Sequence, residues 1–222
     1  MPDSRTHRGR HPDDAEAFAE AMVPRLREAT DDLCWLLGRG YSRTAATTLV
    51  GDRYALVTRQ RKALERVAAT AEQRANRQGR RVEASALRGE LLQIDGYNLL
   101  LTVESAFGGG LVLAARDGTY RDLASISGSY RRVVETGPAL EACGRWLEAA
   151  GPREVHWLFD RPISNSGRLR THLVALAAER GWPWRVELVD DPDPFLAASE
   201  AIVATADSAI LDRCRRWIDL SR

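Results

Sequence analysis

Hydrophobic side chains in the first third of the chain recur at helical spacing. Between residues 13 and 75 they follow a period of about 3.6 residues, which predicts a small α-helical domain. Pro24 is expected to bend or break the first helix, and Ser42 is expected to cap the second. Residues 1–12 lack an apolar core and are expected to form a disordered tail. The polar, aperiodic segment 76–89 is expected to be a linker.

After residue 90 the pattern changes to short apolar runs that alternate with helical segments. Residues 90–222 are therefore expected to form an α/β domain with a Rossmann-like parallel sheet and helices on both faces. The strands are expected at 91–94, 155–159, 186–189 and 201–205, with a tight turn at Asp117-Gly118 after a further apolar run at 111–115. The helices are expected at 122–132, 137–150, 166–181 and 208–217, and Pro192 and Pro194 are expected to break the chain after the third strand.

Composition and motifs narrow the classes of protein to which this chain can belong. Lys and Arg total 32 while Asp and Glu total 31, so the net charge does not by itself indicate a nucleic-acid partner. The three cysteines form no CxxC pair, which argues against a disulfide scaffold or a zinc ribbon and predicts a cytoplasmic protein. No apolar run approaches the ~18 residues that a membrane span needs. No GxGxxG follows the first strand, and GxxxxGK[ST] and GxSxG are missing, which disfavours dinucleotide oxidoreductases, P-loop proteins and α/β-hydrolases.

Each of the four predicted strands of the parallel sheet leads to an aspartate. Asp95 follows the first strand, Asp160 the second, Asp190 and Asp191 the third, and Asp207 the fourth. Because the carboxyl ends of parallel strands meet at one edge of a sheet, these side chains are expected to lie close together. A divalent cation, Mg²⁺ or Mn²⁺, would relieve the repulsion between them, with Asp95, Asp207 and Asp160 as ligands. The alternative is that Asp95 only caps the following helix.

Polar side chains close to these strand ends are candidates for substrate contacts. Asn98 and Ser208 follow the first and the last of the aspartates within one helical turn. Ser166 and Arg168 open the helix after the second strand, and a helix N-terminus with a serine and an arginine suits a phosphate. The alternative for Ser166 is a plain capping role.

The second predicted helical stretch is locally basic. It contains Arg53, Arg59, Arg61, Lys62 and Arg66, with Tyr54 among them. The pattern predicts either a groove for a polyanion or a solvated helix face with intrahelical pairs such as Glu65 with Arg61. In the first case the helical domain would bind RNA; a protein partner or a second copy of the chain is a further alternative.

The sequence resembles two known families. The segments DGYN (95–98) and TAD (205–207), each after a hydrophobic strand, resemble motifs of the NYN branch of the PIN-like nuclease superfamily. Over its whole length the chain also resembles a prokaryotic family called domain of unknown function 434. The residues that suggest this second likeness are 39–41, 50–54, 59–61, 95–98, 164–168 and 204–208.

The first resemblance implies a fold and a chemistry. PIN-like enzymes are Mg²⁺- or Mn²⁺-dependent RNases with a Rossmann-like parallel sheet and three or four acids at its edge. By resemblance Asp95 and Asp207 match best, and Asp160 is similar to the acid after the second strand of the NYN branch. The helix-borne acid of the family has no clean match here, and Asp122 is taken for it.

Together with the strand-end carboxylates, the resemblance to PIN-like nucleases implies a divalent-metal-dependent hydrolase that cuts RNA phosphodiester bonds. Asp95, Asp160, Asp207 and Asp122 would be the catalytic residues. Two alternatives stay open. A non-catalytic RNA- or protein-binding module of PIN-like fold would differ in metal binding, and a small-molecule phosphohydrolase would have a closed pocket of ~300–1,000 Å³.

Overall fold

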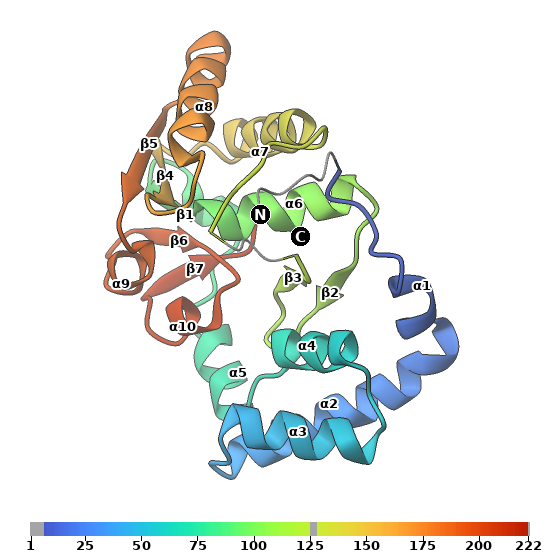
Figure 1. Cartoon of the computed structure of the whole chain (residues 1–222). Helices are drawn as coiled ribbons and strands as arrows, with labels where there is room; N and C mark the ends of the chain where they lie inside the picture. Colours follow the sequence, from blue (N-terminus) through green and yellow to red (C-terminus); the bar gives the residue numbers. More distant parts are fainter. Residues whose placement is uncertain (1–6, 125–127, 222) are drawn as a thin grey trace.

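The structure, a computed structural model, describes residues 7–124 and 128–221 (Figure 1). It combines an N-terminal helical region with a region built on a five-stranded parallel sheet. The helical region comprises α1 (Asp14–Ala17), η1 (Glu20–Met22), α2 (Val23–Gly38), α3 (Arg43–Arg53), α4 (Thr58–Val67) and α5 (Ala71–Gln78). The sheet region comprises η2 (Ala84–Leu87), β1 (Leu91–Asp95), α6 (Gly96–Phe107), β2 (Val112–Ala114), β3 (Tyr120–Asp122), α7 (Thr136–Ala150), β4 (Glu154–Asp160), α8 (Ser166–Arg180), β5 (Trp184–Val189), α9 (Pro192–Ala197), β6 (Ile202–Ala204), α10 (Ser208–Leu211) and β7 (Arg216–Ile218).

The parallel sheet has the strand order β5-β4-β1-β6-β7. The chain passes from β1 outward through β4 to β5, then returns to the other side of β1 through β6 and β7. This order confirms the expected α/β class with a parallel sheet. The direction of winding reverses between β1 and β6, where Ile94 pairs with Ala204. In open α/β sheets ligands bind outside the carboxyl ends of the strands at such a reversal.

Helices cover both faces of the sheet. On one face α6, α7 and α8 bury Ile94, Trp157 and Phe159, the inward side chains of the two central strands (Figure 1). On the other face α9 and α10 pack over Val203 and Trp217. Both central strands are buried on each side, which explains why their sequences are apolar almost throughout.

The helical region has its own core around Leu33, Val50 and Leu64. The helical pattern of its first segment is broken just before Pro24, which lies in the first turn of α2, where its missing N–H is not needed. The Ser42 hydroxyl oxygen accepts a hydrogen bond from the Ala45 N–H (3.3 Å), which confirms the predicted cap of α3. Among the described residues, no helix combines the length and the apolar composition that crossing a membrane requires.

A buried ion cluster ties α5 to the sheet region. Arg77 is fully buried, and its guanidinium contacts Asp117 and Asp212. Arg121 donates a second bond to Asp117 Oδ2 (2.6 Å). Within the segment 76–89, predicted to be a linker, residues 76–78 belong to α5 and residues 84–87 form η2.

Three other predicted elements differ in the structure. Asp122 ends strand β3, which pairs with β2 across the predicted Asp117-Gly118 turn, so the helix expected from Asp122 does not begin there. Pro192 does not end an element but starts α9, where proline suits the first helical position. The last helix stops at Leu211, and β7 follows as a fifth parallel strand.

The N-terminal segment also departs from expectation. Residues 1–6 of the predicted disordered tail lie outside the described residues. Arg8, however, is buried, and its Nε donates to Glu104 Oε2 on α6 (3.0 Å). Contacts from His7 and Arg8 hold these two residues against the sheet region, so the prediction of disorder was wrong for them.

Candidate functional site

One hydroxyl group joins the ends of β1 and β6. The Asp207 N–H donates to Thr205 Oγ1 (3.0 Å), and the same hydroxyl donates to Asp95 Oδ2 (2.8 Å). Asp95 is the last residue of β1, and Thr205 directly follows β6. The Thr205 hydroxyl therefore ties the Asp95 carboxylate to the backbone of Asp207 at the reversal of the sheet.

Neighbouring contacts fix the backbone on both sides of this link. Asn98 Oδ1 accepts a hydrogen bond from the Ala206 N–H (2.8 Å), so α6 holds the loop that carries Asp207. Asp207 Oδ1 accepts from the N–H groups of Ala209 (2.7 Å) and Ile210 (3.3 Å), which makes Asp207 the N-cap of α10. At Gly96, a Cβ atom would lie 2.5 Å from the Phe159 ring. Only glycine therefore allows α6 to start this close to β4.

Asp95 is a buried acid without a cationic partner among its principal interactions. It is 6% exposed, and burial raises its pKa to about 7. Hydrogen bonds from the Thr205 hydroxyl and from the backbone N–H of Asn98 favour the ionised form of Asp95, while the charges of Asp207 and Asp193 oppose it. Asp95 can therefore gain or lose a proton near neutral pH, which is uncommon for an aspartate and frequent at functional sites.

Asp193 is a member of this site that the sequence reasoning missed. Its pKa is raised by burial and by the charges of Asp207, Asp191 and Asp160. It lies in the first turn of α9, after β5, between the two prolines that predicted only a chain break. The available signal was the repeated Asp-Pro pattern at 191–194, because proline and acids are both favoured at the start of a helix.

Asp160 lies at the same edge, on the β4 side of β1. Burial and the charge of Asp191 raise its pKa, and its own charge acts on Tyr97 in the first turn of α6. The edge thus carries a row of acids: Asp95, Asp160, Asp191, Asp193 and Asp207. We call this row the acidic edge.

Asp122 lies away from the acidic edge. Its carboxylate accepts from the Thr102 hydroxyl (2.8 Å) and from the Ala124 N–H (2.6 Å). Thr102 is seven residues after Asp95, about two turns along α6. The charge of Asp122 acts on Lys62 of α4, so the structure does not group this residue with the strand-end carboxylates.

The carboxylate oxygens of the acidic edge suit a hard cation, but these carboxylates are not closely grouped. Within 7–124 and 128–221, no group of three or more His, Cys, Asp or Glu side chains is close enough to hold a metal ion. Mg²⁺ is commonly bound by one or two carboxylates together with water and a substrate phosphate. Asp95 and Asp207 are the candidates for such a pair: burial is the largest cause of the raised pKa of Asp95, and the charge of Asp207 raises it further.

The other side chains that were predicted to contact a substrate have different environments in the structure. The Ser166 hydroxyl donates to the Arg161 carbonyl (3.1 Å), so it stabilises the start of α8 and is not available to a ligand as a donor. The Ser208 carbonyl accepts from Arg77 (3.3 Å), which ties α10 to the buried ion cluster. Arg168 is exposed and lines a pocket of about 390 Å³.

The basic helical stretch is largely paired within the fold. Arg53 contacts Asp32, Arg59 contacts Asp14, and Arg61 donates to Asp52 (2.8 Å). These contacts favour the alternative of a structural, solvated face over a polyanion groove. The expected Glu65 partner of Arg61 is replaced by Asp52 of α3.

Two families match consecutive segments of the chain. The family described as "Protein of unknown function (DUF434)" matches residues 25–80, and the family described as "Domain of unknown function (DUF5616)" matches residues 84–222. The likeness to the first family is thus confirmed for the N-terminal segment and not for the whole chain. An uncharacterised protein of Methanocaldococcus jannaschii is 25% identical over 190 residues, which cover 84% of this chain and 88% of that protein. No solved structure matches the chain.

Proposed function

The chain belongs to the family described as "Domain of unknown function (DUF5616)", and we propose that it is a divalent-metal-dependent ribonuclease of PIN-like fold. The observation that carries this proposal is the Thr205 hydroxyl at the reversal of the sheet, which bonds both the Asp95 carboxylate and the backbone N–H of Asp207. The charge of the Asp207 carboxylate also acts on Asp95, which supports a shared cation site made by these two carboxylates. The strand order, with the first strand central and winding outward on both sides, is in keeping with a Rossmann-like domain of this kind.

Asp95 and Asp207 would hold the ion. When bound, it would supply activation of water and stabilisation of charge on the phosphoryl oxygens. Thr205 fixes the Asp95 carboxylate, and Asn98 fixes the loop of Asp207, so the pair is held before a substrate arrives. Asp193 places a further carboxylate at the acidic edge, where its charge acts on Asp95, and it would accept a proton from the attacking water.

The test is cleavage of single-stranded and structured RNAs with Mn²⁺ or Mg²⁺, and with EDTA as the metal-free control. We expect cutting only with the metal. Asp95→Asn and Asp207→Asn should each lower the rate by at least about 100-fold, the upper end of the cost of losing an outer-shell partner of a metal site. The matched control is Asp52→Asn, the same chemical change on an exposed face of α3, which should leave the rate unchanged.

Calorimetric titration with Mn²⁺ separates the enzyme from its alternatives. Binding to the wild type that is lost in Asp95→Asn, together with RNA cleavage, supports the proposal. A folded wild type that binds Mn²⁺ and cuts no RNA overturns the ribonuclease and favours a binding module or a small-molecule phosphohydrolase. Cleavage that persists in both edge variants would show that another site does the chemistry.

A further inference from the structure

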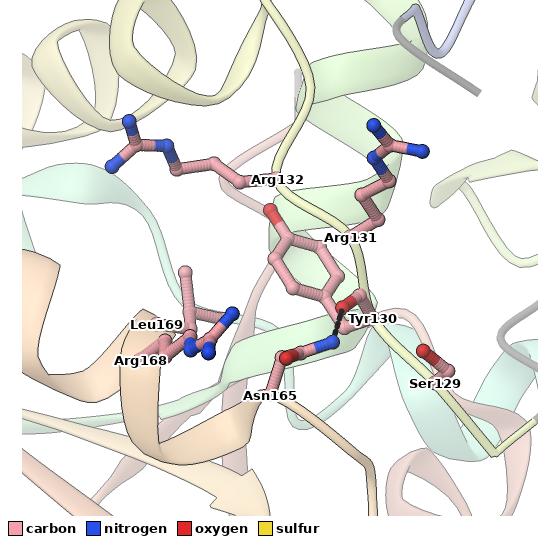
Figure 2. A pocket seen from close by; sticks show the side chains of 7 residues that line it. All are labelled: Ser129, Tyr130, Arg131, Arg132, Asn165, Arg168 and Leu169. Carbon is pink, nitrogen blue, oxygen red and sulfur yellow. Dashed lines mark hydrogen bonds between the residues drawn. The ribbon is translucent and has the colours of Figure 1, made fainter. Parts of the chain in front are cut away.

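A basic pocket lies between α8 and the segment that precedes α7. Its volume is about 390 Å³, and its lining consists of Ser129, Tyr130, Arg131, Arg132, Asn165, Arg168 and Leu169. Figure 2 shows Arg131 and Arg132 leaving the chain on opposite sides of Tyr130, with Arg168 facing them from the first turns of α8. The seven lining residues include three arginines and no acid.

Two of the three arginines that line this pocket have no charged or hydrogen-bonding partner in the part of the chain that the structure describes. Arg132 and Arg168 form no hydrogen bond or ion pair with any part of the chain that the structure describes. The positive charge of Arg132 also reaches His172, one turn beyond Arg168 on α8, and contributes with burial to a lowered pKa of that histidine. Most other arginines near the sheet region are paired, as Arg77 and Arg121 are with Asp117. Two unpaired guanidiniums on facing elements are an arrangement that suits phosphate.

The pocket is rigidly built. Asn165 Nδ2 donates to the Tyr130 carbonyl (3.0 Å), which joins the start of α8 to the opposite wall (Figure 2). Tyr130 itself is buried, and its hydroxyl bonds Glu104 (2.5 Å), the residue that Arg8 contacts from the other side. The backbone carrying the arginines is therefore fixed by the core.

The pocket is connected to the acidic edge through packed aromatic rings. The Tyr130 ring lies 5.4 Å from Tyr97, and Tyr97 lies 4.9 Å from Phe159, the residue before Asp160. The loop after Asp160 leads directly into α8. The pocket and the acidic edge therefore both lie at the carboxyl end of the sheet. The pocket is positively charged, and the acidic edge is negatively charged.

We infer that this pocket binds a phosphate group of the substrate, next to the phosphodiester that reaches the acidic edge. This inference rests on the proposed function for the identity of the substrate as RNA. Negative charge at the edge alone would repel a polyanion, whereas an arginine pocket beside it attracts the strand and aligns it. The ligand class is a phosphate group, present either within a strand or as the monoester of a nucleotide.

The experiment is a binding measurement that needs no cleavage. Fluorescence anisotropy of a labelled single-stranded RNA is followed in EDTA at several salt concentrations, for the wild type and for the Arg132→Gln/Arg168→Gln variant. We expect about tenfold weaker binding at low salt for each guanidinium that binds a phosphate. The slope of the salt dependence should also decrease by roughly 0.7 for each phosphate that the variant no longer neutralises. The matched control is Arg25→Gln/Arg27→Gln, which also removes two positive charges, from exposed positions of α2.

Competition then distinguishes the two sources of phosphate. Displacement of the RNA from the wild type by adenosine 5′-monophosphate supports a monoester site. Loss of RNA binding in the double variant without such displacement supports an internal phosphate of the strand. Equal RNA binding by the wild type and the double variant overturns the inference. Because the readout is in EDTA, it stands whether or not the protein proves to cut RNA.

Discussion

Two buried aspartates in this molecule have opposite surroundings. Burial alone would raise the pKa of Asp117, but the guanidiniums of Arg121 and Arg77 and the Thr119 hydroxyl outweigh it and hold the pKa below its usual value. Asp95 has no such cation among its main influences, and its pKa rises to about 7. The same residue type thus serves as a structural anchor at one place and as a carboxylate that lacks a counter-ion at the other. The presence or absence of neighbouring cationic side chains therefore distinguishes the two aspartates.

The largest change in stability is expected on replacing Asp117. Asp117→Asn removes the charge that two buried guanidiniums share, and breaking a buried pair of this kind costs about 3–5 kcal/mol. Urea unfolding should show this loss. The control is Asp212→Asn, which removes a partly exposed partner of Arg77 and should cost much less. A loss below about 1 kcal/mol for Asp117→Asn would mean that the cluster does not stabilise the docked α5.

At the acidic edge, replacing an aspartate is expected to raise the free energy of unfolding and not to lower it. The folded pKa of Asp95, about 7, lies above its ordinary value of 3.8, so the ionised side chain destabilises the fold. Its contribution makes the unfolding free energy fall as the pH rises from about 4 to about 7, and stay low above that. Asp95→Asn should therefore stabilise the metal-free protein at pH 8 by on the order of 2–4 kcal/mol, and by little at pH 4. Urea unfolding at the two pH values measures this difference, and a variant less stable than the wild type at pH 8 would contradict it.

A smaller effect on stability is expected when the charge of Asp207 is removed. Asp207→Asn keeps an N-cap residue at α10 but removes one charge that acts on Asp95. The pKa of Asp95 should fall, although it should stay above its usual value because burial is the larger cause. Carbon-13 NMR of the aspartate carboxyl groups can follow this titration. The gain in stability at pH 8 should be below about 1 kcal/mol, as for partly exposed charge pairs. An unchanged Asp95 titration would indicate that the two carboxylates do not sense each other.

Much of the central sheet could be predicted from the sequence. The runs at 91–94 and 155–159 are apolar almost throughout, which is typical of strands buried on both faces, and each ends in an aspartate. The positions of Asp95 and Asp160 at strand ends, and of Asp207 shortly after β6, were therefore predictable from the sequence. In contrast, β7 has only three residues and begins with an arginine, so its periodicity was too short to separate it from the preceding helix.

Residues whose role depends on distant contacts could not be predicted. The Arg8 pairing with Glu104 and the Arg77 contact with Asp117 join segments that are far apart in the chain. Asp193 was hidden between prolines that also begin helices, and Ser166 turned inward to a carbonyl that the sequence could not indicate. Local patterns give the position of a polar residue along the chain, but the partner of its side chain comes from tertiary packing.

The Thr205 hydroxyl has a single hydrogen atom, and its direction is fixed. Because the oxygen accepts from the Asp207 N–H, the hydrogen is directed to Asp95 Oδ2. Oδ2 therefore accepts a hydrogen bond that ties the end of β1 to the residue after β6, and the two oxygens of the Asp95 carboxyl group are inequivalent. A proton that Asp95 takes up on Oδ1 leaves this link between the two strands in place.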